Sequence, residues 1–276
     1  MALKKRLLAT DLDGTLIPSE LADDQSPELR ALQRLRQCVL EGDLAIVYVT
    51  GRHIESVLGV METRSLPRPT WIICDVGSSL FASHQGSYQI VADYVTHLED
   101  LTGGRDAQSL RSLLLAVTTL TLQEAEKQRR YKLSYYCQAT LIQPAVKQIE
   151  AILQAHDLRY GVVSSVDPFD GRGLIDVLPA NIDKAYALNW WAAWQGLDPR
   201  QIVFAGDSGN DYAAFVSGFR GILVGNADAE LANRLRMHHQ QAGTSDRIYF
   251  AKSIHTAGVL EGCRHYQWFA QADAEA

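Results

Sequence analysis

Leu7-Leu8-Ala9-Thr10-Asp11-Leu12-Asp13-Gly14-Thr15 is the stretch of sequence that decides the fold. Residues 7–10 form a short, mainly apolar run, which is typical of a strand buried on both faces of a parallel sheet. Asp11 and Asp13 follow at once, at the strand end where open α/β sheets place their ligands. Their side chains point the same way, because side chains alternate along an extended backbone. Two close carboxylates need a cation or a shared proton, which predicts a divalent metal; a simple Asp-Gly turn is the alternative.

The first third of the chain alternates strand and helix signals. Ser26-Pro27 predicts a helix start, because a hydroxyl cap precedes a proline, and Gly42 predicts the helix end. Residues 45–49 and 71–74 are two further apolar runs of strand type, and the first of them ends at Thr50. This order of elements predicts an α/β protein whose core is a doubly wound, Rossmann-like parallel sheet.

The middle of the chain has a different pattern. Helical spacing alternates there with three short strand-like runs, at residues 132–137, 160–164 and 174–178. The pattern predicts an inserted α+β domain of an ordinary domain size. We therefore expect an α/β core made of residues 1–83 and 180–276, and an inserted α+β domain made of residues 84–179.

The parallel pattern resumes after the insertion. A helix is expected from Asp183-Lys184, and strands are expected at residues 202–205 and 222–224. The expected helix carries three tryptophans whose spacing predicts packing in the core, namely Trp190, Trp191 and Trp194.

Composition limits the class of protein. The chain has 276 residues, 47% hydrophobic residues and a net charge of −6, without a basic block of the kind that nucleic-acid binding requires. It has no apolar stretch of membrane-spanning length, and Asp11 interrupts the first apolar run too early for a signal peptide. The four scattered cysteines predict free or structural thiols. We expect a soluble cytoplasmic protein that is a monomer or a weak oligomer.

Four sites share one geometric property, since each follows an apolar strand or opens a helix beside the same sheet edge. They are Asp11 with Asp13, Thr50, Lys184, and Asp207 with Asp211. Carboxylates offer the hard oxygen ligands that Mg²⁺ prefers. A hydroxyl and an ammonium can stabilise phosphate oxygens as charge moves in the transition state. Each residue alone has a structural explanation, such as a cap or a solvated side chain. Together they predict metal-assisted phosphoryl transfer.

These motifs, in this order, resemble the four motifs of the haloacid dehalogenase superfamily over essentially the whole chain. The motifs are Asp11-Leu-Asp13-Gly-Thr15, Thr50, Lys184 and Gly206-Asp207-Ser208-Gly209-Asn210-Asp211. The resemblance implies that Asp11 is a nucleophile that takes up phosphate as an aspartyl-phosphate. It implies that Asp13 protonates the leaving oxygen and then activates water.

The resemblance also implies a ligand set for Mg²⁺. The side chains of Asp11 and Asp207 and the main-chain carbonyl of Asp13 would bind the ion, and Asp211 would orient its water ligands. Lys184 would hold the nucleophile and the phosphate. Two further residues would support the site, namely Ser208 and Asn210.

The insertion between Thr50 and Lys184 resembles the second cap type of this superfamily, a lid that generally admits sugar phosphates and excludes water. Finer similarity is to the sucrose-phosphate phosphatase branch. It is carried by Tyr48-Val-Thr50-Gly-Arg52, Asp75-Val-Gly77-Ser, Lys132-Leu-Ser-Tyr-Tyr136, Ile175-Asp176-Val-Leu-Pro179 and Ser253-Ile-His255-Thr-Ala-Gly258-Val-Leu-Glu261. One departure is Gly14, where many members of this branch carry asparagine.

This finer similarity implies a substrate. Gly51 and Arg52 would lie near the sugar phosphate, while Lys132 and Asp176 would reach sugar hydroxyls; an exposed strand face and a structural carboxylate are the alternatives. His255 is interpreted as a satisfied structural histidine or an outer residue of the site rather than a metal ligand, because no ligand partner lies at metal spacing. The resemblance implies hydrolysis of sucrose 6-phosphate, with a sucrose-phosphate synthase as a candidate partner. Mannosylfructose phosphate and glucosylglycerol phosphate are alternative substrates. A hexose phosphomutase and a non-catalytic sugar-binding subunit are alternative functions.

Overall fold

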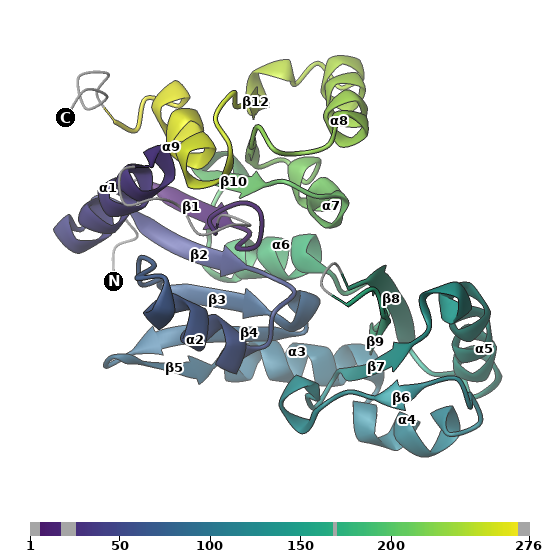
Figure 1. Ribbon diagram of the computed structural model, residues 1–276. Helices are drawn as coiled ribbons and strands as arrows, with labels where there is room; N and C mark the ends of the chain where they lie inside the picture. Colours follow the sequence, from purple (N-terminus) through teal and green to yellow (C-terminus); the bar gives the residue numbers. More distant parts are fainter. Residues whose placement is uncertain (1–5, 18–25, 168–169, 270–276) are drawn as a thin grey trace. The chain divides into compact units, whose positions relative to one another are not determined.

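The computed structural model describes residues 6–17, 26–167 and 170–269, and Figure 1 shows its helices and strands. The chain divides into two compact units. The first comprises the described residues of Met1–Gly77, Phe81–Gln89 and Lys184–Ala276, and the second those of Ser78–Leu80 and Ile90–Asp183. The domain boundaries expected from the sequence, at residues 84 and 179, lie a few residues from these limits.

A large sheet forms the centre of the first unit. Within the described residues its strand order is β12-β11-β10-β1-β2-β3-β4-β5, and the pairs from β12 to β3 are parallel. The strands are β1 (Leu7–Thr10), β2 (Ala45–Val49), β3 (Trp71–Cys74), β4 (Ser79–His84), β5 (Ser87–Ile90), β10 (Ile202–Gly206), β11 (Arg220–Leu223) and β12 (Ile248–Phe250). The observed order confirms the predicted doubly wound α/β core.

Helices cover both faces of this sheet (Figure 1). They are α1 (Pro27–Glu41), α2 (Ile54–Thr63), α6 (Lys184–Trp194), α7 (Tyr212–Phe215), α8 (Ala229–Gln241) and α9 (His255–His265). Helix α1 begins and ends as predicted: Ser26 Oγ accepts a hydrogen bond from the N–H of Leu29, and Gly42 is left-handed at φ 87°. Among the described residues, no helix has both the length and the apolarity of a membrane span.

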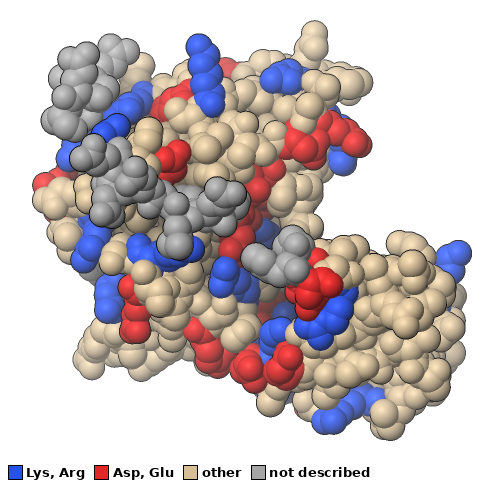
Figure 2. Space-filling view, viewed as in Figure 1, with Lys and Arg blue, Asp and Glu red and all other residues tan. Residues whose placement is uncertain are grey.

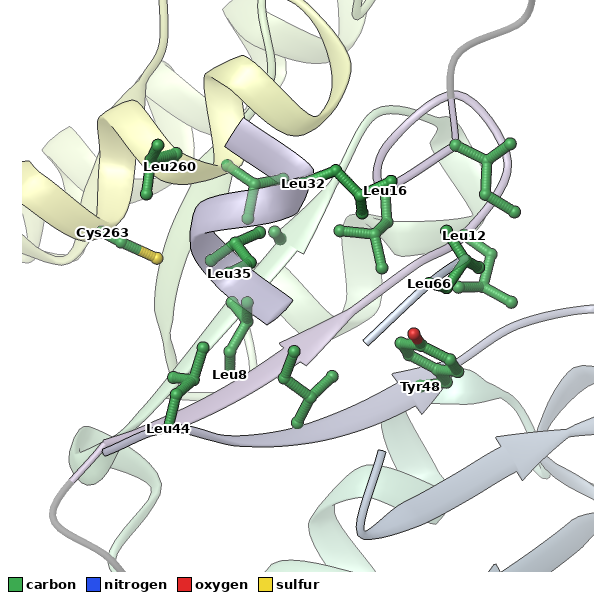
Figure 3. Packing of buried hydrophobic residues seen from close by; sticks show 14 of the residues in the cluster. Leu8, Leu12, Leu16, Leu32, Leu35, Leu44, Tyr48, Leu66, Leu260 and Cys263 are labelled. Carbon is green, nitrogen blue, oxygen red and sulfur yellow. The ribbon is translucent and has the colours of Figure 1, made fainter. Parts of the chain in front are cut away.

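The core lies between the sheet and these helices. On one face, Leu8 of β1 packs with Leu35 of α1 and with Leu260 and Cys263 of α9 (Figure 3). On the other face, alternate strand residues meet α6 and α7. The rings of Trp71 and Trp191 are 5.2 Å apart there, and those of Phe204 and Phe215 are also 5.2 Å apart. Burial on both faces explains why the strands are apolar throughout rather than alternating.

The second unit is a layer of helices on a smaller sheet. Within its described residues the strand order is β6-β7-β9-β8, and the pairing is antiparallel. Its elements are α3 (Ala92–Thr102), α4 (Ala107–Leu114), β6 (Thr121–Leu122), β7 (Leu133–Cys137), α5 (Ile142–Ala155), β8 (Tyr160–Val166) and β9 (Gly173–Pro179). Leu133, Tyr135 and Ile175 pack against α4 and α5, so the alternate strand residues face away from these helices.

One expectation about the core needs correction, and one pair of strands was missed. Of the three tryptophans on α6, only Trp191 is fully buried; Trp194 is 40% exposed and stacks on Trp190 at 5.6 Å. The reason is that positions 190 and 194 lie one helical turn apart on the face of α6 away from the sheet. The pair β4–β5 was not predicted. Its Gln85-Gly86 turn has positive φ at both residues, the conformation of a tight hairpin, and the X-Gly pair was the available signal.

Charged side chains of both signs lie interspersed on the face of the molecule that Figure 2 shows. The four cysteines all lie among the described residues, where they are buried and form no disulfide.

Candidate active site

The carboxyl ends of β1, β2 and β10 meet at one edge of the large sheet. Asp11, Thr50 and Asp207 come directly after these three strands. The parallel register sets Thr10 beside Ala205 and Tyr48, and the N–H of Asp11 donates to the carbonyl of Ala205 at 2.9 Å. The strand ends therefore bring together residues that are almost 200 positions apart, as the motif order predicted.

Asp11 is a buried carboxylate with a fixed orientation. Its side chain accepts a hydrogen bond from the N–H of Leu12 at 2.8 Å through Oδ1. Its Oδ2 lies 3.0 Å from Nζ of Lys184, the first residue of α6. The same Nζ is 2.9 Å from Oδ1 of Asp211. Asp11 and Lys184 are each 5% exposed, so the pair is shielded from bulk water.

A third carboxylate completes an acidic cluster. One carboxylate oxygen from each of Asp11, Asp207 and Asp211 can be chosen so that all lie within 4.8 Å of one another. Asp211 belongs to the 3₁₀ turn Gly209–Asp211, where its Oδ2 accepts from the N–H groups of Asp207 and Ser208, both at 3.2 Å. These bonds fix Asp211 and tie the loop after β10 to the cluster.

The cluster contains more negative charge than its lysine can neutralise. Burial, opposed by Lys184 and assisted by Asp211, raises the pKa of Asp11. Burial also raises the pKa of Asp207 to about 6. For Lys184, burial would lower the pKa, but Asp11 and Asp211 outweigh it and raise that pKa, so the ammonium stays charged. Three close carboxylates with hard oxygen atoms and one lysine fit a small divalent cation such as Mg²⁺.

Asp13 lies at the exposed rim of this cluster and is paired with Arg52. The guanidinium contacts both carboxylate oxygens, with Nε 2.7 Å from Oδ2 and Nη2 2.6 Å from Oδ1. The hydrogen bond to Asp13 raises the pKa of Arg52. Thr50 is fully buried, and its Oγ1 accepts from the N–H of Arg52 at 3.2 Å. Gly51, between them, is exposed.

The residues after Asp13 reach Asp207. Thr15 Oγ1 donates to Asp207 Oδ1 at 2.8 Å, which orients that carboxylate. Gly14 has φ 76°, and a Cβ added there would stand 2.3 Å from Asp207 Oδ2. The departure from asparagine at position 14 therefore has a local reason, because a side chain would displace Asp207.

The remaining predicted residues are placed as follows. Ser208 donates to Asp211 through both its N–H and its hydroxyl, and Asn210 is exposed on the same turn. In the second unit, Lys132 is 5% exposed, which corrects the alternative of an exposed strand position. Its Nζ lies 3.5 Å from Asp176 Oδ1, which also accepts from Ser134 Oγ at 2.5 Å.

Sequence reasoning missed two features of the site. The first is Asn226, whose Nδ2 donates to the carbonyl of Gly14 at 2.7 Å. Its position two residues after the strand expected at residues 222–224 was the available signal for it. The second concerns His255, whose buried Nδ1 has no hydrogen-bond partner among the described residues. The interpretation as a satisfied structural histidine is therefore wrong at this atom, and the alternative interpretation as an outer residue of the site stays a prediction.

Comparisons with known proteins show what the chain is similar to. The family model described as sucrose-6F-phosphate phosphohydrolase matches residues 4–267. A putative HAD-like hydrolase of Nitrosococcus oceani is 34% identical, over 95% of this chain and 72% of that protein. The mannosylfructose-phosphate phosphatase of Agrobacterium fabrum is 31% identical, over 95% of this chain and 96% of its own.

A solved structure extends the likeness to the fold. The sucrose-phosphatase of Synechocystis sp., in complex with sucrose and phosphate, has a TM-score of 0.71 and 25% identity, and the match covers 97% of this chain and 100% of that one. Because the family model spans nearly the whole chain, this protein is a phosphatase of the haloacid dehalogenase superfamily and belongs to the sucrose-6F-phosphate phosphohydrolase family.

Proposed function

We propose that this protein is a Mg²⁺-dependent phosphatase that hydrolyses a sugar phosphate, specifically sucrose 6-phosphate, to the free sugar and phosphate. The observation that carries the proposal is the environment of Asp11, a buried carboxylate at a strand end with Lys184 at 3.0 Å and two further carboxylates within 4.8 Å. A purely structural ion pair would not need three carboxylates around one lysine. A nucleophile that works beside a divalent cation does need the additional carboxylates, because they bind the cation.

The first chemical step transfers the phosphoryl group to the protein. An oxygen of the Asp11 carboxylate attacks phosphorus, the bond from phosphorus to the ester oxygen breaks, and the leaving sugar oxygen takes a proton from Asp13. Lys184 and Thr50 stabilise the phosphoryl oxygens by charge and hydrogen bonding. The sugar then leaves, and Asp11 carries the phosphoryl group.

The second step regenerates the carboxylate. A water molecule gives a proton to Asp13 as its oxygen attacks phosphorus, the bond to Asp11 breaks, and inorganic phosphate leaves. Asp13 ends the cycle protonated and Asp11 ends it ionised, as both began. Because an alkoxide-like oxygen leaves poorly without a proton, an acid at position 13 is required for a sugar ester.

Asp11, Asp207 and the main-chain carbonyl of Asp13 would hold Mg²⁺, with Asp211 fixing the surrounding loop. The ion, when bound, supplies positive charge that stabilises the phosphoryl oxygens in both steps. The surplus of carboxylates described above supports this assignment. Thr15 and Asp211 orient the ligands through hydrogen bonds, as outer partners do in metal sites.

The second unit supplies the groups proposed to recognise the sugar. Ser134 pairs with Asp176 across strands β7 and β9, and both face away from the helices. Lys132 offers a charged donor and Asp176 a carboxylate acceptor, while the fully buried Ser134 orients Asp176 through its hydrogen bond. A sugar hydroxyl both donates and accepts, so this donor and acceptor suit it. The contact between Lys132 and Asp176 fixes both side chains before a ligand arrives.

Mannosylfructose phosphate is the second candidate substrate. The mannosylfructose-phosphate phosphatase matched above aligns with this chain over nearly its whole length. This match favours a phosphorylated disaccharide as the substrate, with fructose joined to one of several hexoses. If substrate comes from a sucrose-phosphate synthase, that synthase is the expected partner.

A phosphate-release assay tests the proposal. The purified protein is given sucrose 6-phosphate, mannosylfructose phosphate, glucosylglycerol phosphate and hexose monophosphates, each with and without Mg²⁺. We expect Mg²⁺-dependent release, fastest with sucrose 6-phosphate. Asp11→Asn keeps the shape of the side chain but removes the nucleophile, so it should abolish turnover and leave the circular dichroism spectrum unchanged. Turnover retained by that variant would refute the mechanism. Isomerised hexose phosphates among the products would indicate a phosphomutase, and sugar binding without turnover in the wild type would indicate a binding subunit.

A further inference from the structure

The side-chain amide of Asn226 joins two segments that lie far apart in the sequence. Nδ2 donates to the carbonyl of Gly14 at 2.7 Å, and Oδ1 accepts from the N–H of His255 at 2.9 Å. A carbonyl can only accept and a main-chain N–H can only donate, so the two contacts require an amide in this orientation. The amide therefore connects the turn after Asp13 to the first residue of α9.

Hydrogen bonds and close packing also hold the loop that carries Asn226 in place. Gly225 donates its N–H to the carbonyl of Ser253 at 2.9 Å, and a Cβ on Gly225 would stand 2.8 Å from that carbonyl oxygen. Glu261 of α9 accepts from the N–H groups of Lys252 and Ser253, at 3.0 and 2.8 Å. The loop before α9 is thus bonded to the helix, and the loop carrying Asn226 is packed directly against it.

The turn that Asn226 contacts carries groups of the active site. Gly14 lies between Asp13 and Thr15, and its Cα faces the carboxylate of Asp207 with no room for a Cβ. A second bond from α9 supports the same turn, since Thr256 Oγ1 donates to the carbonyl of Leu16 at 2.7 Å. Of these two hydrogen bonds, the one from Asn226 is made to Gly14, which directly follows Asp13 in the chain.

We propose that Asn226 is a positioning residue, which holds the turn 13–15 so that Asp13 is aligned with the leaving oxygen of the substrate. The inference rests on the proposed function, because Asp13 is the proton donor in that mechanism. Asn226 itself is exposed and bonds to no part of Asp11, Lys184 or Asp207 in the described structure. It acts on the reaction only through Gly14.

The test uses two phosphate esters that differ in their need for an acid. A sugar oxygen must be protonated as it leaves, whereas p-nitrophenolate leaves readily without a proton. Asn226→Asp keeps the size of the side chain and the acceptor for His255, but it sets a carboxylate oxygen against the carbonyl of Gly14. Asn226→Ala removes both contacts. Asn233→Asp is the matched control, because it makes the same chemical change at an exposed position of α8.

The expected result is a selective loss. Both Asn226 variants should lower the rate of sugar release in the first turnover by about tenfold or more, a part of the roughly 10²–10⁴-fold that a general acid contributes. The first-turnover release of p-nitrophenolate and the KM values should change far less, because only the second step, in which Asp13 takes a proton from water, is common to both esters. The control should match the wild type with both esters. Thermal unfolding of each variant checks that the fold is retained.

Other outcomes overturn the inference in separable ways. An equal loss of the first-turnover rate with both esters would mean that Asn226 supports the fold or the nucleophile and not the acid. A rise in KM with unchanged kcat would mean that it binds substrate directly. If the wild type hydrolyses neither ester, the proposed function itself fails, and the inference falls with it.

Discussion

Arg52 and Asp13 form a bidentate pair in which both carboxylate oxygens are contacted by the guanidinium, at 2.6 and 2.7 Å. This geometry fixes the plane of the Asp13 carboxylate, the form that accepts a proton from water in the proposed second step. Arg52→Lys keeps the positive charge but offers a single point of contact in place of a fork. We expect kcat/KM for the sugar phosphate to fall by about tenfold or more, as measured by steady-state kinetics.

Arg200 provides the control for that substitution. It forms a similar pair with Asp198, with Nη2 2.6 Å from Oδ2, on the 3₁₀ turn Pro199–Gln201 before β10. Arg200→Lys should leave kcat/KM unchanged, because this pair is not part of the cluster. Equal kinetic effects of the two substitutions would contradict a specific role for Arg52.

Within the described part of the chain, Lys184 supplies the positive charge that lies among the buried carboxylates. Lys184→Met introduces a side chain of similar size and removes the positive charge beside Asp11 and Asp211. Removing one partner of a buried ion pair costs about 3–5 kcal/mol. We therefore expect the free energy of unfolding, measured in urea, to fall by about 3–5 kcal/mol, and we expect turnover to be lost. An unchanged free energy of unfolding would show that the carboxylates are relieved in another way.

Cation binding should stabilise the folded protein. An ion that binds only the native cluster shifts unfolding to higher temperature as its concentration rises. We expect Mg²⁺ to raise the melting temperature of the wild type and EDTA to reverse the effect. Asp207→Asn removes one of the charged ligand atoms and should give a clearly smaller shift. A wild-type melting temperature independent of Mg²⁺ would count against the site.

Gly14 should not tolerate a side chain. Gly14→Ala combines a strained backbone at φ 76° with a Cβ 2.3 Å from Asp207 Oδ2. Gly104→Ala is matched in backbone strain, with φ 78°, but its Cβ would meet no atom within 4 Å. Both should lose about 1 kcal/mol of stability from the backbone. Only the first should also lose activity and the stabilisation by Mg²⁺. Full activity in Gly14→Ala would show that Asp207 can move freely.

Glu261 predicts a pH dependence of stability. Burial alone would raise its pKa, but hydrogen bonds from the N–H groups of Lys252 and Ser253 and from the hydroxyl of Tyr249 lower it overall. Because the pKa of Glu261 is lower in the folded protein than in the unfolded chain, the carboxylate stabilises the fold at pH values above its unfolded pKa. This stabilisation is lost as the pH falls through the folded pKa. Glu261→Gln should therefore cost about 1 kcal/mol near neutral pH, a modest figure because the group is half-buried.

Urea unfolding across the acidic range checks the sign. The difference between wild type and Glu261→Gln should be constant near neutral pH and should shrink once the pH falls below about 4. A difference that grows as the pH falls would contradict the assigned hydrogen bonds.

The strand ends that carry the candidate site residues could be predicted from the sequence, because local rules decide them, whereas the roles of these residues were inferred from the family resemblance. The apolar run before Asp11 specifies a buried strand, and the Ser26-Pro27 start and Gly42 stop of α1 are satisfied by neighbours only a few residues away. Parallel strands bring their carboxyl ends to one edge whatever separates them in the sequence. The convergence of Asp11, Thr50 and Asp207 follows from that rule.

Contacts between distant segments were decided by the tertiary structure alone. Which tryptophan of α6 is buried depends on how that helix sits against Trp71, and spacing along one helix does not contain that information. Asn226 has no motif of its own, since its role comes from two bonds to the turn at Gly14 and to α9. Residue type and local pattern determine the elements and the chemistry, whereas hydrogen-bond partners across the sheet edge depend on ångström distances that only packing sets.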